Sequence, residues 1–117
     1  MLSAADILKA EDLPVQCVAV PEWGGDVYVA TLRADERDEL EESWLKIRNA
    51  DSNEGFRAYC VAFCLCEADG KRLFNDGVLE AARALGKRSA KPVSRLFDVA
   101  CKLNGLTGND VKELEKN

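Results

Sequence analysis

The longest apolar stretch of the chain is residues 56–67, FRAYCVAFCLCE, where few polar side chains interrupt the hydrophobic ones. A segment that is apolar on every side must be enclosed by other elements, whether it is a helix or a strand. The chain before and after it consists of amphipathic pieces that can enclose it. We therefore expect this stretch to form the centre of the core.

Two alternative structures, a hairpin and a helix, fit residues 60–74. Asp69-Gly70, with the apolar Leu73-Phe74 after it, favours a hairpin, which would make the preceding segment a strand. The length of the segment, its alanines and a cap at Ser52 or Asn53 favour a helix that ends at about Glu67. We take the helix as the prediction, followed by a turn or an extended piece.

Two β-branched stretches ahead of this segment predict an N-terminal β-hairpin. Val15–Val20 lies between two prolines. Alternate side chains of Asp26–Leu32 would lie on opposite faces of a strand. The connecting PEWGGD contains paired glycines, which permit the positive φ of a tight turn. Trp23 at this tip either packs onto the domain or serves as an exposed anchor for a partner.

The sequence specifies the structure of residues 1–13 only weakly. It predicts a helical turn over Ala4–Lys9 and leaves the mobility of this segment open.

Hydrophobic positions at helical spacing, with polar caps ahead of them, predict four amphipathic helices around the central one. These helices are Ala34–Arg48, Gly77–Leu85, a helix from Ser89 to Asn104-Gly105, and Gly108–Lys116, with Asp35, Asp76, Ser89 and Thr107 as caps. The predicted fold is α+β and mostly α, with the N-terminal hairpin followed by four to five helices packed around the buried helix at about 56–67. It is a single domain over residues 1–117, in which residues 106–117 form a weakly anchored C-terminal helix.

Charge and composition narrow the function classes. With 16 basic against 21 acidic side chains the net charge is −5, which argues against an electrostatic grip on nucleic acid or on an anionic membrane. No apolar run has membrane-spanning length, and the first residues lack the basic and apolar regions of a secretory signal, so we expect a cytoplasmic location. The chain has no histidine, which removes Ser-His-Asp and Cys-His catalysis.

The five cysteines are expected to be reduced, buried and structural, because an odd count without framework spacing is typical of cytosolic thiols. The alternative is a zinc site at Cys60, Cys64 and Cys66. On a helix the first two would share a face from which Cys66 points away, and no CxxC pair exists. We therefore expect no metal, no cofactor and no enzymatic activity.

The order of motifs over most of the chain resembles the tail assembly chaperones of long-tailed, siphovirus-type bacteriophages. The segments that carry the resemblance are MLSAADILKAEDLP, VPEWGGDVYVATL, ERDELE, CEADGKRLF and LFDVACKLNGLTGNDVKELEKN, of which the last is the most specific. The length of the chain also matches the family. The five cysteines and Pro92 lie outside the family pattern and contradict none of it.

The resemblance implies a non-enzymatic role in the morphogenesis of a phage or prophage. Such proteins bind the long, helical, apolar tape measure protein, keep it soluble and help to recruit tail tube subunits. They work in the host bacterial cytoplasm and are absent from the mature virion. The family also implies a programmed frameshift near the end of the gene. Glu115-Lys116-Asn117 can be encoded with the slippery heptamer A AAA AAC, so we expect this chain to be the short, unextended form.

A chaperone for a coiled-coil-like client needs exposed apolar surface and a solubilising charge. The acidic surface supplies the charge, and the candidate contact residues are Trp23, Leu106, Val111 and Leu114, all of which also fit the core. The alternative function is a structural head–tail connector or minor tail subunit, which would oligomerise permanently. A small enzyme with a reactive cysteine is a third class, and self-association of the chain stays open.

Overall fold

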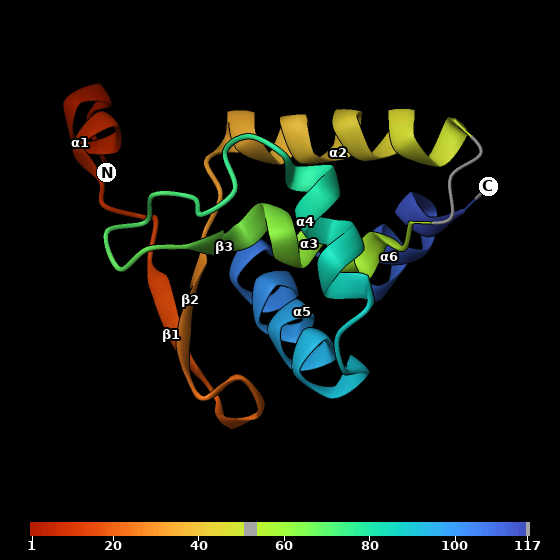
Figure 1. Ribbon diagram of the computed structural model, residues 1–117. Helices are drawn as coiled ribbons and strands as arrows, with labels where there is room; N and C mark the ends of the chain where they lie inside the picture. The colour runs from red at the N-terminus through yellow and green to blue at the C-terminus, as the bar shows by residue number, and fades with distance from the viewer. Residues whose placement is uncertain (51–53, 117) are drawn as a thin grey trace.

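A buried helix, α3 (Phe56–Cys64), lies at the centre of the fold (Figure 1). The structure is a computed structural model that describes residues 1–50 and 54–116. Seven of the nine side chains of α3 are buried, and the helix packs on α2 (Ala34–Asn49), α4 (Val78–Gly86) and α5 (Ala90–Asn104). The predicted place of this segment at the centre of the core is confirmed.

The prediction that this helix continues to Glu67 is wrong beyond Cys64. Leu65–Cys66 instead form a short strand, β3, that pairs antiparallel with the second strand of the hairpin. Both residues are buried, so the strand pairing supplies hydrogen bonds that their backbone could not obtain from water. Gly70, at φ 91°, donates a backbone hydrogen bond to the Glu67 carbonyl (2.9 Å). The turn that the hairpin interpretation predicts therefore exists, but only Leu65–Cys66 before it are extended, and the residues before β3 are helical.

The predicted hairpin is confirmed, and the sheet has the antiparallel order β1-β2-β3. Strand β1 covers Val15–Val20, a 3-10 turn (η1) covers Pro21–Trp23, and β2 covers Gly25–Ala30. Gly24 adopts φ 79° in the turn, as the paired glycines predict. The strand ends two residues earlier than predicted because the next backbone groups bond elsewhere: the Thr31 amide donates to the Pro14 carbonyl (3.2 Å) and the Leu32 amide to the Asn104 side chain (2.7 Å).

Five helices follow the hairpin in the described residues, which confirms an α+β fold that is mostly helical. Two predicted caps are wrong. Arg33 is the N-cap of α2, because the Glu36 carboxylate reaches back to the Arg33 amide (2.9 Å) and Asp35 lies inside the first turn. Gly77, at φ 73°, replaces Asp76 as the N-cap of α4. Ser52 and Asn53, the caps predicted for α3, lie outside the described residues, and Gly55 is its N-cap.

The two remaining helices differ in how they meet the body. Helix α6 (Gly108–Glu115) begins at the predicted cap Thr107 and packs on α2. Helix α1 (Ala4–Lys9), which confirms the predicted turn, has no buried residue and projects away from the body (Figure 1). None of the helices in residues 1–50 and 54–116 is long and apolar enough to cross a membrane.

Candidate partner-binding surfaces

Three cysteines occupy the core, as predicted. A hydrogen bond with Cys64, together with burial, raises the pKa of the Cys60 thiol well above its usual value. Burial raises the pKa of Cys66, which lies in β3, to about 11. Because the thiolate is both the nucleophile and the metal ligand, these two thiols stay protonated and unreactive near neutral pH.

The other two cysteines are less enclosed. Cys17 is exposed, so its predicted burial is wrong: β1 turns Val18 and Val20 inward, and alternation along a strand then turns Cys17 outward. Cys101 is half-buried, and burial raises its pKa. All five thiols are free. In residues 1–50 and 54–116, no group of three or more His, Cys, Asp or Glu side chains is placed to hold a metal ion.

Trp23, the first predicted contact residue, packs on the edge of the core. Its side chain is half-buried against the core cluster at the end of η1. The neighbouring Glu22 accepts two hydrogen bonds from the Arg95 guanidinium (2.9 and 2.7 Å), which ties the hairpin tip to α5. The same contact lowers the pKa of Glu22 to about 2. The tip is therefore docked on the body in this structure.

The other three predicted contact residues also face the core. Leu106 and Leu114 are 7% and 9% exposed, and Val111 packs half-buried beside them. Helix α6 is held by more than these apolar side chains, because Trp44 Nε1 donates a hydrogen bond to the Leu114 carbonyl (2.6 Å). The hairpin tip and α6 lie at different ends of the molecule (Figure 1), so Trp23 and the tail do not form one surface.

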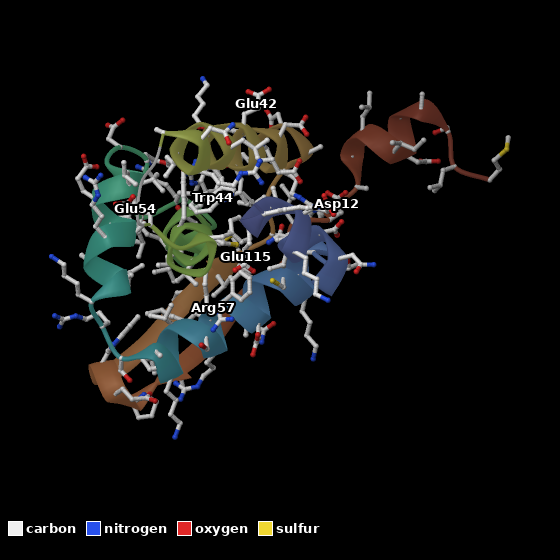
Figure 2. The ribbon with its side chains drawn as sticks, turned by 90° about the vertical axis from the view of Figure 1, so that its right-hand side faces the viewer. Asp12, Glu42, Trp44, Glu54, Arg57 and Glu115 are labelled. Carbon is white, nitrogen blue, oxygen red and sulfur yellow. The ribbon has the colours of Figure 1, made fainter. Side chains whose placement is uncertain are left out.

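An apolar surface that the sequence reasoning missed lies at the other end of the chain. Of the six exposed large hydrophobic side chains in the described residues, five belong to residues 1–13, which we call the arm: Met1, Leu2, Ile7, Leu8 and Leu13. The sixth is Leu73. Figure 2 shows the arm standing clear of the body, with its side chains pointing into solvent.

Within the arm, α1 has a capped N-terminus although its side chains are exposed. Ser3 and Asp6 form a capping box, in which the Asp6 amide donates to Ser3 Oγ (3.1 Å) and the Ser3 amide to Asp6 Oδ2 (2.9 Å). Ile7 and Leu8 follow Ala4 by three and four residues and share its helix face. Both signals, the S-x-x-D box and the spacing, are legible in the sequence, but the helix is too short for periodicity alone to mark it as a contact surface.

A second surface is an open groove of about 550 Å³ between α3, α4 and α5. Its floor is largely apolar and its rim is basic. The residues that line it are Glu54, Gly55, Arg57, Ala58, Ala82, Arg83, Leu85, Gly86, Lys87, Arg88, Ala90, Val93 and Ser94. Figure 2 shows Glu54 beside α4 and Arg57 beside α5, at two sides of this groove. We call it the basic groove.

Comparison with models of known protein families, with curated proteins and with solved structures gives no match.

Proposed function

We propose that this chain is a tail assembly chaperone of a long-tailed phage or prophage, acting without enzymatic chemistry. It binds the tape measure protein, keeps it soluble and helps to recruit tail tube subunits in the host bacterial cytoplasm, and it does not remain in the virion. The order of sequence motifs described above supports this proposal. The structural observation that supports it best is the arm, whose helix α1 has no buried residue and exposes the apolar side chains of Ile7 and Leu8.

The arm suits a client that is itself a long apolar helix. Ile7 and Leu8 are 59% and 86% exposed and lie on one helix face, the arrangement by which a short helix packs against another. Exposed apolar side chains gathered in this way mark interaction sites in soluble proteins. The net charge of −5 keeps the complex soluble. Because Leu106 and Leu114 are enclosed in the core, the arm is a better client contact than the tail.

The experiment is co-expression of the chain with the tape measure protein encoded beside it, followed by capture of one through the other. The double substitution Ile7→Asp and Leu8→Asp should abolish capture, because it places two charges on the apolar face of α1. Leu73→Asp, at an exposed leucine outside the arm, is the matched control and should capture normally. Equal capture by both variants would remove the arm from the client site. Failure of the wild type to capture this client would overturn the proposed function.

Two further observations separate this function from that of a head–tail connector or minor tail subunit. The chaperone should be missing from purified particles by mass spectrometry, whereas a connector would be retained. The gene should end in a slippery heptamer with an overlapping −1 frame, from which the longer form is made. A terminus encoded without such a run would remove the frameshift from the proposal.

A further inference from the structure

A hollow of about 330 Å³ lies at the base of the arm, between the start of β1 and the loop that follows β3 (Figure 1). Apolar side chains form one part of its lining: Leu13, Val15 and Ala30. Charged and amide side chains from the start of α2 and from the loop form the rest. We call it the arginine pocket, after Arg72, which is one of these loop residues.

Arg72 is held in a fixed orientation within the body. Its side chain is only 9% exposed. Its Nε donates a hydrogen bond to the Phe63 carbonyl (2.9 Å), and its guanidinium carbon lies 3.7 Å from the centre of the Phe63 ring. Because arginine stays protonated even when it is enclosed, these two contacts keep a positive charge at one place in the lining of the pocket.

The two terminal nitrogens of Arg72 are available to a further acceptor. Within residues 1–50 and 54–116 neither of them forms a hydrogen bond, and Nη1 lies 4.0 Å from the exposed Glu39 Oε2, beyond hydrogen-bond distance. The planar fork that these nitrogens form matches the two oxygens of a carboxylate. A nearly enclosed arginine thus contributes unused donors to a pocket that it lines.

The acidic side chains of the pocket already hold backbone amides. Glu36 Oε1 accepts a hydrogen bond from the Arg33 amide (2.9 Å), and Asp69 Oδ1 accepts one from the Lys71 amide (2.9 Å). The lining carries three basic side chains against these two acidic ones, on a chain whose net charge is −5. In the part of the chain that the structure describes, the Lys71 ammonium forms no ion pair and the Asn75 side chain no hydrogen bond. The unused groups of the pocket are therefore mainly donors, which suit an anion.

We propose that the arginine pocket binds a carboxylate that is attached to a small apolar group. The carboxylate accepts hydrogen bonds from the Arg72 fork beside Lys71, and the apolar group packs on Leu13, Val15 and Ala30. Such a group is a small carboxylic acid or the C-terminus of a peptide whose last residue is apolar. This inference goes beyond the proposed function and requires no tape measure protein.

The test is titration of the purified full chain with N-acetylleucine, followed by nuclear magnetic resonance. The expected dissociation constant is about 1 mM or lower, as for a ligand of this size. The Nε–H signal of Arg72 and the backbone amides of residues 69–75 should shift, and those of α6 should not. N-acetylleucine amide lacks the charge and acetate lacks the apolar group, so each should bind about tenfold or more weakly.

Substitutions of Arg72 test the fork directly. Arg72→Gln should weaken binding by about tenfold or more, because it removes the charged donors. Arg72→Lys keeps the charge but lacks the fork, and should bind with intermediate affinity. Arg72 also contacts Phe63, so circular dichroism and thermal melting check that both variants fold.

Two further substitutions leave the contacts of Arg72 in place. Lys71→Gln removes one positive charge and Asn75→Asp adds a negative one, both at exposed positions, and each should weaken binding by about threefold. Lys112→Gln and Asn109→Asp make the same changes at exposed positions of α6, outside the pocket, and should bind as the wild type does.

The source of the carboxylate is separated by a short peptide that ends in leucine, with a free or an amidated C-terminus. Tighter binding of the free peptide than of N-acetylleucine identifies a peptide end as the ligand, and weaker binding identifies a small acid. The absence of a saturable shift up to about 10 mM N-acetylleucine would overturn the proposal. So would equal affinity for the acid and its amide, or unchanged binding by the folded variants at Lys71, Arg72 and Asn75.

Discussion

At the scale of single residues, Asn104 joins the hairpin to the helical part of the molecule. It is the last residue of α5, and its Oδ1 accepts a hydrogen bond from the Leu32 amide (2.7 Å). Its Nδ2 donates to the Ala30 carbonyl (3.2 Å) and to the Ala100 carbonyl (3.0 Å). One amide side chain thus satisfies the backbone where β2 ends, a part-buried place where water access is limited.

Asn104→Ala should destabilise the domain. The Leu32 amide and the Ala30 carbonyl lose their side-chain partner together, and leaving such groups unsatisfied costs about 1–3 kcal/mol. Urea unfolding of the substituted and wild-type chains measures this difference. Asn109→Ala, at an exposed asparagine on α6, is the control and should change the free energy of unfolding by less than about 0.5 kcal/mol. Equal stability of the two variants would show that Asn104 does not join these elements.

The Glu22–Arg95 contact predicts a defined dependence of stability on pH. Hydrogen bonds from Arg95 lower the pKa of Glu22 from 4.5 to about 2. A carboxyl whose pKa is lower in the folded state stabilises the fold above its unfolded pKa and loses that effect as pH falls through the folded value. The stability difference between the wild type and Glu22→Gln should therefore be constant above about pH 5 and vanish near pH 2. Denaturation at a series of pH values measures it, and a difference that persists unchanged at pH 2 would contradict it.

The thiols should react in an order set by their enclosure. Cys17 is exposed and should be labelled first by a thiol reagent at neutral pH, followed by the half-buried Cys101. Cys60, Cys64 and Cys66 should react only on unfolding, because all three are buried and raised pKa values keep Cys60 and Cys66 protonated. Mass spectrometry of the labelled peptides gives the order. Rapid native labelling of any of the three buried thiols would revive the reactive-cysteine alternative.

At the scale of elements, the sequence predicts most helices and strands but not all of their ends. Hydrophobic periodicity places α5 correctly, and β-branched residues between two prolines place β1. Gly105, at φ 65°, ends α5 where the Asn-Gly pair predicts. The end of α3 could not be predicted, because an all-apolar segment has no periodicity to distinguish helix from strand. What decides it is the pairing of Leu65 with Val29 across the sheet, a tertiary contact.

The positions of the helix N-caps are likewise not fully predictable from the sequence. Asp35 and Asp76 have the right chemistry for an N-cap, yet each lies one or two residues from the position that the backbone uses. In α2 the choice is made by Glu36, which bonds the Arg33 amide, and in α4 by the positive φ of Gly77. Competing caps within one turn differ too little in energy for the sequence to rank them.

The docking of α6 depends on a hydrogen bond that hydrophobic patterns do not show. Trp44→Phe keeps an aromatic ring in the core but removes the donor to the Leu114 carbonyl. The loss should cost about 1–3 kcal/mol, because this bond is buried. Hydrogen exchange should speed up in α6 more than in α5. Trp23→Phe is the control, since that ring is only half-buried, and equal exchange in the two variants would contradict the assigned role.

At the scale of the whole molecule, the chain divides into a body that is built around α3 and an arm that contributes nothing to the core. The candidate contact residues predicted from the sequence belong to the body. They are apolar or aromatic, and the core needs the same residue types as a binding surface does. The basic groove could not be predicted, since the residues that line it come from separate parts of the sequence.

Deletion of residues 1–13 tests this division. None of these residues is buried, so removing them should change the free energy of unfolding by less than about 0.5 kcal/mol. The same deletion should abolish client capture. Deletion of residues 106–116 is the contrasting control, because it removes the buried Leu106 and Leu114 and should destabilise the body by about 3 kcal/mol or more. A large loss of stability on removing the arm would show that the arm is part of the fold and is not a free surface for binding a partner.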